Sequence, residues 1–136
     1  MSEDLVRRAT ELTSSDGLVS DEELEQMYTP DVVLDLNARV FNPKVYEGYD
    51  GLRQFYAESR EVWEEVTLTI HEIIAEGDRY VVLGDGRSRG RGSGMEVSAG
   101  FTGIWTVAGG RLKHFRLLST AEADRELGLE ALRDQS

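Results

Sequence analysis

Four consecutive runs rich in Val, Ile, Thr and aromatic residues constrain the fold of this chain more than any other feature. They cover residues 66–75, 79–91, 95–108 and 111–119, and glycine-containing turn signals separate them. The two-residue connections Gly77-Asp78 and Gly109-Gly110 are typical of tight antiparallel hairpins. We therefore predict a meander in which strands that follow each other in the sequence pair with each other.

The third run is too long to stay straight in a small domain. Its fourteen residues, Met95 to Ala108, would span roughly 45 Å as an extended strand. Gly100 and Gly103 within the run allow the backbone to bulge or bend without a steric penalty at Cβ. We expect a sheet that curves into a half-open cone, with an inside and an outside.

The first half of the chain carries helical patterns. Residues 2–14 and 20–28 have apolar residues at helical spacing, and Ser20 with Glu23 forms a capping box that opens the second helix, which we expect to end at Pro30. The run from Val32 to Asn37 alternates like a strand, and Asp50 is expected to cap a third helix with the clearest apolar stripe. Ser119 and Glu122 form a second capping box, for a terminal helix through Leu132.

Composition limits the function classes. The chain has 136 residues with 40% hydrophobic content, which predicts a single domain, 1–136, with one core. A formal net charge of −11 disfavours nucleic acid and anionic membrane surfaces as partners. Without cysteine, disulfides, thiolate metal sites and cysteine nucleophiles are excluded. The acidic amino terminus has no apolar signal core, and we expect a cytoplasmic protein.

The order helix, helix, strand, glycine loop, helix, four-strand meander resembles the nuclear transport factor 2-like superfamily, specifically its SnoaL-like branch. The resemblance covers almost the whole chain. The segments that carry it are 28–35, 46–56, 76–82 and 102–112. It implies an α+β fold: a cone-shaped, curved antiparallel sheet whose concave face is covered by N-terminal helices, often in a homodimer through the outer sheet face. Relatives include polyketide cyclases, steroid isomerases, epoxide hydrolases and plain binding modules, so the resemblance alone does not fix a reaction.

Asp35 is the candidate general base. A carboxylate held in an apolar cavity is costly to ionise, so its pKa rises and it becomes a better base near neutral pH. Asp35 is flanked by leucines, and Asn37, two residues on, is a candidate to position substrate or water. The alternative is that Asp35 faces solvent or pairs with an arginine.

Arg87 and His114 are the other candidate catalytic residues. Arg87, Arg89 and Arg91 alternate at period two, so they are expected to share one strand face and to pair with carboxylates, or, for Arg87, to enter a pocket and bind a carboxylate or enolate oxygen. His114 is a candidate acid or base, as is His71 with lower weight, and both are alternatively structural residues. Two histidines without cysteine make a zinc site improbable, and we expect neither metal nor cofactor.

Aromatic residues are numerous enough to form a core and to line a pocket for a flat apolar ligand. The candidate substrate-binding residues, besides Asn37, are Tyr28, Tyr56, Trp63, Phe101, Trp105 and Arg116. Two function classes stay open. One is a cofactor-independent isomerase, cyclase or hydrolase acting on a small hydrophobic molecule. The other is a non-catalytic dimeric binding or interaction module, which is favoured because the isomerase-type tyrosine on the first helix and a last-strand carboxylate are both missing.

Overall fold

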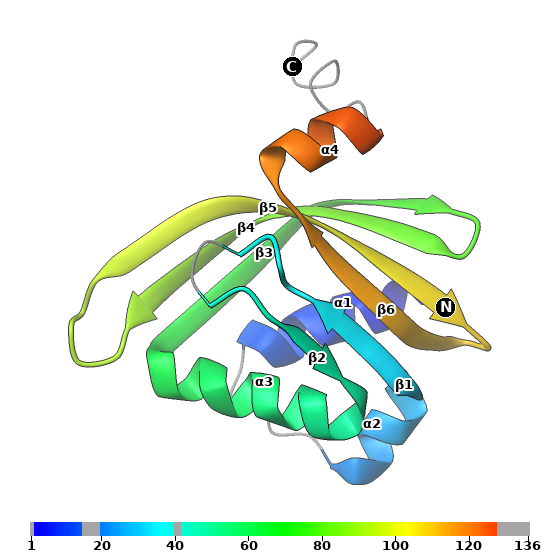
Figure 1. The fold of residues 1–136 in the computed structure, drawn as a ribbon, viewed down its shortest axis with the longest axis horizontal. Coiled ribbons are helices and arrows are strands. Elements are labelled where there is room, and N and C mark those ends of the chain that lie inside the picture. The colour runs from blue at the N-terminus through cyan, green and yellow to red at the C-terminus, as the bar shows by residue number, and fades with distance from the viewer. Residues whose placement is uncertain (1, 15–19, 40–41, 128–136) are drawn as a thin grey trace.

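The computed structural model describes residues 2–14, 20–39 and 42–127 (Figure 1). A six-stranded sheet is the centre of the fold, with the order β2-β1-β6-β5-β4-β3. The elements are α1 (Ser2–Ser14), α2 (Asp21–Met27), β1 (Tyr28–Asp35), β2 (Val45–Glu47), α3 (Gly48–Val62), β3 (Trp63–Glu76), β4 (Arg79–Gly90), β5 (Glu96–Ala108), β6 (Arg111–Leu118) and α4 (Thr120–Leu127). The α+β class and the curved sheet are as the sequence predicted.

The predicted meander is confirmed for β3 to β6, which pair antiparallel in sequence order. The turns have the expected backbone: Gly77, Gly109 and Gly110 all have positive φ. The sheet as a whole is mixed, however, because β1 pairs in parallel with β6 and antiparallel with the short β2. The sequence pattern predicted neither β2 nor this parallel pairing.

The helices α1, α2 and α3 cover one face of the curved sheet, which we call the concave face (Figure 1). The main hydrophobic core lies there and joins apolar residues of these helices to inward-facing strand positions. Residues with less than 2% exposure in this core include Val6, Leu24, Leu52 and Leu112. Each such side chain contributes about 1.5–3 kcal/mol relative to an exposed position, so this layer stabilises the fold strongly.

The opposite, convex face carries a smaller apolar cluster. Val81, Ile104 and Leu118 are buried there together with Ala123 of α4. Helix α4 begins with the predicted capping box: Ser119 Oγ accepts from the Glu122 amide at 3.2 Å, and Glu122 Oε1 accepts from the Ser119 amide at 3.1 Å. The part of the predicted terminal helix beyond Leu127 lies outside the described residues.

Two helix boundaries differ from expectation. Helix α2 has the predicted cap, since Ser20 Oγ accepts from the Glu23 amide at 3.1 Å, but it ends at Met27, and Tyr28, Thr29 and Pro30 already belong to β1. Helix α3 begins at Gly48, so Asp50 lies inside its first turn and is not its cap. An acidic residue there still interacts favourably with the positive end of the helix dipole.

Candidate functional site

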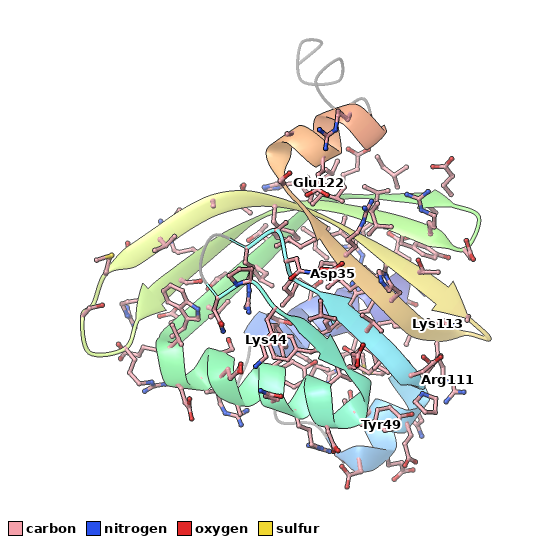
Figure 2. All side chains as sticks on the ribbon, viewed as in Figure 1. Asp35, Lys44, Tyr49, Arg111, Lys113 and Glu122 are labelled. Carbon is pink, nitrogen blue, oxygen red and sulfur yellow. The ribbon has the colours of Figure 1, made fainter. Side chains whose placement is uncertain are left out.

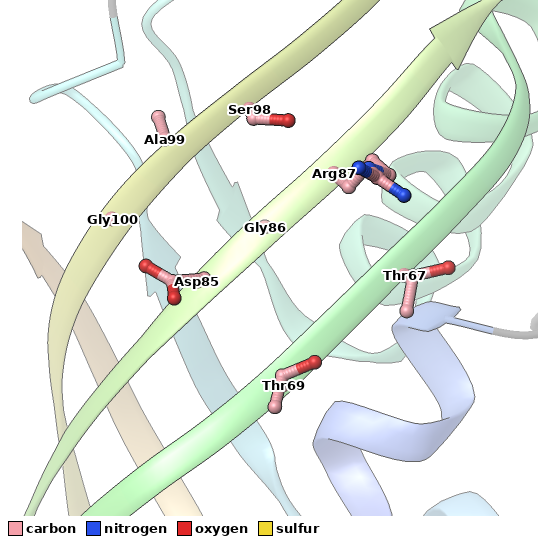
Figure 3. Close-up of a pocket in the computed structure, with 8 residues that line it drawn as sticks. All are labelled: Thr67, Thr69, Asp85, Gly86, Arg87, Ser98, Ala99 and Gly100. Carbon is pink, nitrogen blue, oxygen red and sulfur yellow. The ribbon is translucent and has the colours of Figure 1, made fainter.

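The convex face carries a shallow trough over three strands, with a volume of about 520 Å³ (Figure 3). Strands β3, β4 and β5 contribute its walls, and its floor is open at Gly100, which has no side chain on this face. Register explains the gathering of polar groups: Thr69, Asp85 and Gly100 are consecutive partners across the three strands, and so are Thr67, Arg87 and Ser98. Direct partners on neighbouring strands point to the same face.

His71 joins the trough through a strand irregularity. The register of β3 against β4 shifts between Ile70 and Glu72, so that His71 has no partner of its own in the pairing. Its Nε2 lies 2.5 Å from Asp85 Oδ2, and both side chains are more than half exposed. Simple alternation along residues 66–75 would put His71 and Ile73 on one face, but Ile73 packs in the main core on the concave side, and this expectation is wrong.

Arg87 lines this trough on the convex face, on the other side of the sheet from the helices. Within the described part of the chain, its side chain is exposed and has no ion pair within 4 Å. The neighbouring arginines are engaged. Arg89 binds Glu64 and Glu65, and Arg91 lies in the turn after β4, where it donates to the carbonyls of Arg60 and Trp63. The three arginines therefore do not form one ladder, because Arg91 has left the strand.

Asp35 lies at the end of β1, half-buried, and its side chain projects to the convex face. Its neighbours Leu34 and Leu36 are buried in the main core on the other side. Asp35 Oδ1 accepts from the Asn37 amide at 3.1 Å, so the carboxylate caps the turn that follows the strand, and the Asn37 side chain is exposed. Asp35 is labelled in Figure 2.

His114 and Arg116 lie near Asp35. Arg116 is the register partner of Asp35, and His114 is the partner of Val33, two residues earlier on β1. Phe115 between them packs against Trp105 in the main core, so His114 and Arg116 project to the convex face with Asp35. Three of the predicted site residues thus share one face of two paired strands, at a different place from the trough that holds Arg87.

The predicted aromatic residues lie mostly in the concave core. Tyr28, Tyr56 and Trp105 are between 1% and 6% exposed, and the Tyr28 and Trp105 ring centroids are 6.0 Å apart. Phe101 is half-buried against the same core, and Trp63 is half-buried where α3 passes into β3. Tyr28, Tyr56 and Trp105 are therefore core residues, whereas Phe101 and Trp63 are partly exposed.

The phenols of Tyr28 and Tyr56 form a buried pair. Their oxygens are 3.4 Å apart, so one hydroxyl donates to the other. Burial raises the pKa of Tyr28 well above its ordinary value of 10.0, with a further contribution from Tyr56, and burial raises the pKa of Tyr56 as well. Both phenols stay neutral at physiological pH and act only as hydroxyl donors and acceptors.

A polar cluster at the edge of the core was not predicted. Tyr46, only 3% exposed, donates through its hydroxyl to Glu58 Oε1 at 2.9 Å and accepts from Arg39 Nη2 at 3.3 Å. Lys44 Nζ lies 3.2 Å from Glu58 Oε2 and 5.0 Å from the centre of the Tyr46 ring (Figure 2). The hydrogen bond from Tyr46 is the main cause that lowers the pKa of Glu58, and Lys44 adds to it. In the sequence, the only signal for a buried position here was the aromatic residue Tyr46 in the short segment 44–47.

Neither a metal cluster nor a membrane helix emerges from the described residues. No group of three or more His, Asp or Glu side chains there is placed to hold a metal ion. No helix in the described ranges is long and apolar enough to cross a membrane.

Comparison with solved structures supports the fold. The chain is 26% identical to a nuclear transport factor 2-like protein of unknown function from Burkholderia pseudomallei, with a TM-score of 0.71, covering 91% of this chain and 95% of that one. It is 25% identical to TerC, co-crystallised with polyporic acid, with a TM-score of 0.59 over 76% of this chain and 81% of that one. The epoxide hydrolase/cyclase-like enzyme SalBIII is 14% identical, with a TM-score of 0.68 over 89% and 92%.

Among sequences, the chain matches none of the curated proteins with which it was compared. The family model of the SnoaL-like domain matches residues 6–115, most of the chain. The helices over a curved sheet and the sequence match agree, and the chain belongs to the SnoaL-like domain family.

Proposed function

We propose that this protein binds a small hydrophobic molecule on the concave face, at the end of the sheet near the β4–β5 turn. The observation that carries this proposal is a strip of five apolar residues whose alternation directs them to the helix-covered face although none is fully buried. They are Val66, Leu68, Val97, Ala99 and Phe101. We call them the concave strip.

The residues of the strip are more exposed to water than the inward-facing residues near the other end of the same strands. Val82 and Trp105 are 2% and 6% exposed, whereas Val97 is 39% exposed. Apolar area left open to water costs about 25 cal/mol per Å², so a ligand that covers this strip gains free energy without any polar contact. The Phe101 ring, with glycine at position 84 opposite it, offers a flat surface that suits a flat ligand.

One relative has been co-crystallised with an organic compound. TerC, 25% identical, was co-crystallised with polyporic acid. We therefore expect an organic ligand with a large apolar surface in this chain too, held by burial and by few hydrogen bonds.

Thermal-shift screening tests the proposal with steroids, anthraquinone-type polyketides and terpene epoxides. A ligand at 100 times its dissociation constant stabilises the folded state by about 2.7 kcal/mol, which raises Tm by several degrees. Val97→Lys should abolish the shift because it places a charge in the strip. Ser98→Lys is the matched control, since it adds the same charge one residue on, at an exposed position of the convex face. Loss of the shift in Ser98→Lys alone would contradict the proposal.

A cofactor-independent isomerase, cyclase or hydrolase activity is the second candidate. It is favoured by the placement of Asp35, His114 and Arg116 on one face of β1 and β6, which offers a carboxylate, an imidazole and a guanidinium to one small molecule. The test is incubation with the same compounds, with products followed by NMR. Asp35→Asn should lower the rate at least about 100-fold if this carboxylate is the general base.

We also propose a homodimer, which rests on the family resemblance. Since α4 packs through Ala123 against Val81, Ile104 and Leu118 on the convex face, a second copy would contact the rest of that face, including the trough, so that the dimer and a ligand in the trough would exclude each other. Sedimentation velocity at several protein concentrations tests this, and a single monomeric species at all of them would contradict it. A dimer that binds ligand without turnover would support the non-catalytic module.

A further inference from the structure

The convex trough is a second site, on the opposite face of the sheet from the concave strip. We propose that it binds a flat organic monocarboxylate, with the Arg87 guanidinium on the carboxylate and the glycine floor under the apolar body. This site is independent of the ligand site proposed above, because the strands themselves separate the two.

Arg87 is suited to this role because it is available. Within the described residues it has no ion pair, while Arg89 in β4 is bound to carboxylates and Arg91 in the turn after β4 is bound to carbonyls. A guanidinium presents parallel N–H donors that match the two oxygens of a carboxylate. In a protein of net charge −11, an exposed arginine that forms no ion pair with a described carboxylate is a specific local attraction for an anion.

The walls of the trough supply further donors. Thr67 and Ser98 are the direct register partners of Arg87 on either side, and Thr69 follows on the same face. Figure 3 shows Thr67, Arg87 and Ser98 in one row across the three strands. A carboxylate on Arg87 is therefore within a row of hydroxyl groups that can each donate one hydrogen bond.

The next row defines the charge and shape of the ligand. Asp85 lies in this row, and its carboxylate disfavours a second negative charge, so a monoanion is preferred to a phosphate dianion. Gly100, opposite Asp85, has no side chain, and residue 86 between the rows directs its Cβ position toward Leu68 on the other face, so backbone forms the floor here. A flat ring can lie on that surface with its carboxylate directed to Arg87.

The probe is 2-naphthoate, followed by amide chemical shifts of the full-length chain. We expect saturable shifts at the amides of residues 67–69, 85–87 and 98–100. The uncharged 2-naphthamide should bind at least about tenfold more weakly, because hydrogen bonds to a charged group are the strong ones in this site. Inorganic phosphate should also bind more weakly than 2-naphthoate. Phosphate binding as tight as that of 2-naphthoate would overturn the monocarboxylate assignment.

Three variants locate the site. Arg87→Gln should weaken binding about tenfold or more, whereas Arg79→Gln removes the same charge from an exposed position on the same face of β4, about 27 Å along the strand, and should leave it unchanged. Gly100→Leu should block binding by filling the floor. A Cβ at residue 100 meets nothing closer than 3.5 Å, so the fold tolerates it.

Three results would overturn the proposal. One is unchanged binding in Arg87→Gln, and another is a set of shifts confined to the concave strip and lost in Val97→Lys. The third combines two measurements: the unmodified protein does not bind 2-naphthoate, and Arg87→Gln has an altered sedimentation coefficient. This result would assign the trough to contact between copies. The outcome of the 2-naphthoate experiment does not depend on whether a ligand binds to the concave strip, which Val97→Lys tests separately.

Discussion

The ring of Phe115 lies against the backbone of Gly103 on the neighbouring strand. A Cβ at residue 103 would come within 2.3 Å of Phe115 Cζ and 2.4 Å of Cε1. The ring is held in place from another side by Trp105, with ring centroids 4.9 Å apart. Glycine at this position therefore allows an aromatic layer to lie flat on the curved sheet.

Gly103→Ala should lower the free energy of unfolding by about 1–3 kcal/mol, because the new methyl group displaces a ring that cannot move without disturbing Trp105. Urea unfolding measures the change. Gly100→Ala is the matched control on the same strand. Its Cβ would be 3.5 Å from the nearest atom, so a change within about 0.5 kcal/mol is expected. Equal losses in both variants would show that flexibility, and not the contact with Phe115, is what glycine provides.

Local signals were enough to predict much of the fold. The turns at Gly77 and Gly109 and the capping box at Ser119 follow from short-range chemistry, and each is observed. The parallel pairing of β1 with β6 joins segments about 80 residues apart, and no local pattern encodes it. Strand β2 has only three residues, too few to show an alternation.

The faces of the site residues were harder to predict than the strands. A shift of one residue inverts every side chain that follows, and irregularities interrupt β3 at His71 and β6 between Leu112 and His114. Strict alternation would place His71 on one face with Ile73, and His114 on one face with Leu112, but the structure splits both pairs between the two faces. The grouping of Arg87 with Thr67 and Ser98 likewise depends on register, which only the structure supplies.

The Tyr28 and Tyr56 pair should make stability fall at high pH. Burial raises the pKa of both phenols, so the folded state keeps protons that the unfolded state loses above about pH 10. Their contribution is complete below that pH and is lost as the pH rises through it, with a slope of at most about 1.4 kcal/mol per pH unit for each group. Urea unfolding between pH 9 and 11.5 measures this slope.

Tyr28→Phe should flatten that slope, since the more deeply buried phenol no longer has a proton to lose. Tyr80→Phe, at a half-buried position of β4, is the control and should leave the slope close to that of the unmodified protein. Absorbance at 295 nm gives a second measurement, because the buried phenols should ionise together with unfolding. Full ionisation of all five tyrosines in the folded state would contradict this prediction.

Ser119→Ala should loosen α4 without unfolding the sheet. The Ser119 hydroxyl accepts from the Glu122 amide, and loss of such a cap costs a helix about 1 kcal/mol. Amide hydrogen exchange in residues 121–127 should therefore become about fivefold faster, while exchange in β4 and β5 stays unchanged. Ser119→Asp, which keeps a capping oxygen, should restore the slow exchange. Uniform acceleration across the whole chain would show instead that α4 and the sheet open as one unit.

The hydrogen bond from Tyr46 to Glu58 should make this edge of the core sensitive to acid. The hydrogen bond from Tyr46, followed by the interaction with Lys44, lowers the pKa of Glu58 in the folded state. A carboxylate with a lowered folded-state pKa stabilises the fold at pH values above its unfolded-state pKa of about 4.3, and this contribution is lost as the pH falls through the folded-state pKa.

Tyr46→Phe should cost about 1–3 kcal/mol at pH 7, since it removes a hydrogen bond to a charged group, and much less at pH 3. Urea unfolding at both pH values measures the difference. The control is Tyr49→Phe, which removes a hydroxyl that donates to the backbone carbonyl of Tyr28. The cost of this control should not depend on pH. If Tyr46→Phe costs the same at pH 3 as at pH 7, the hydroxyl supports the core by packing alone, and Glu58 is not its electrostatic partner.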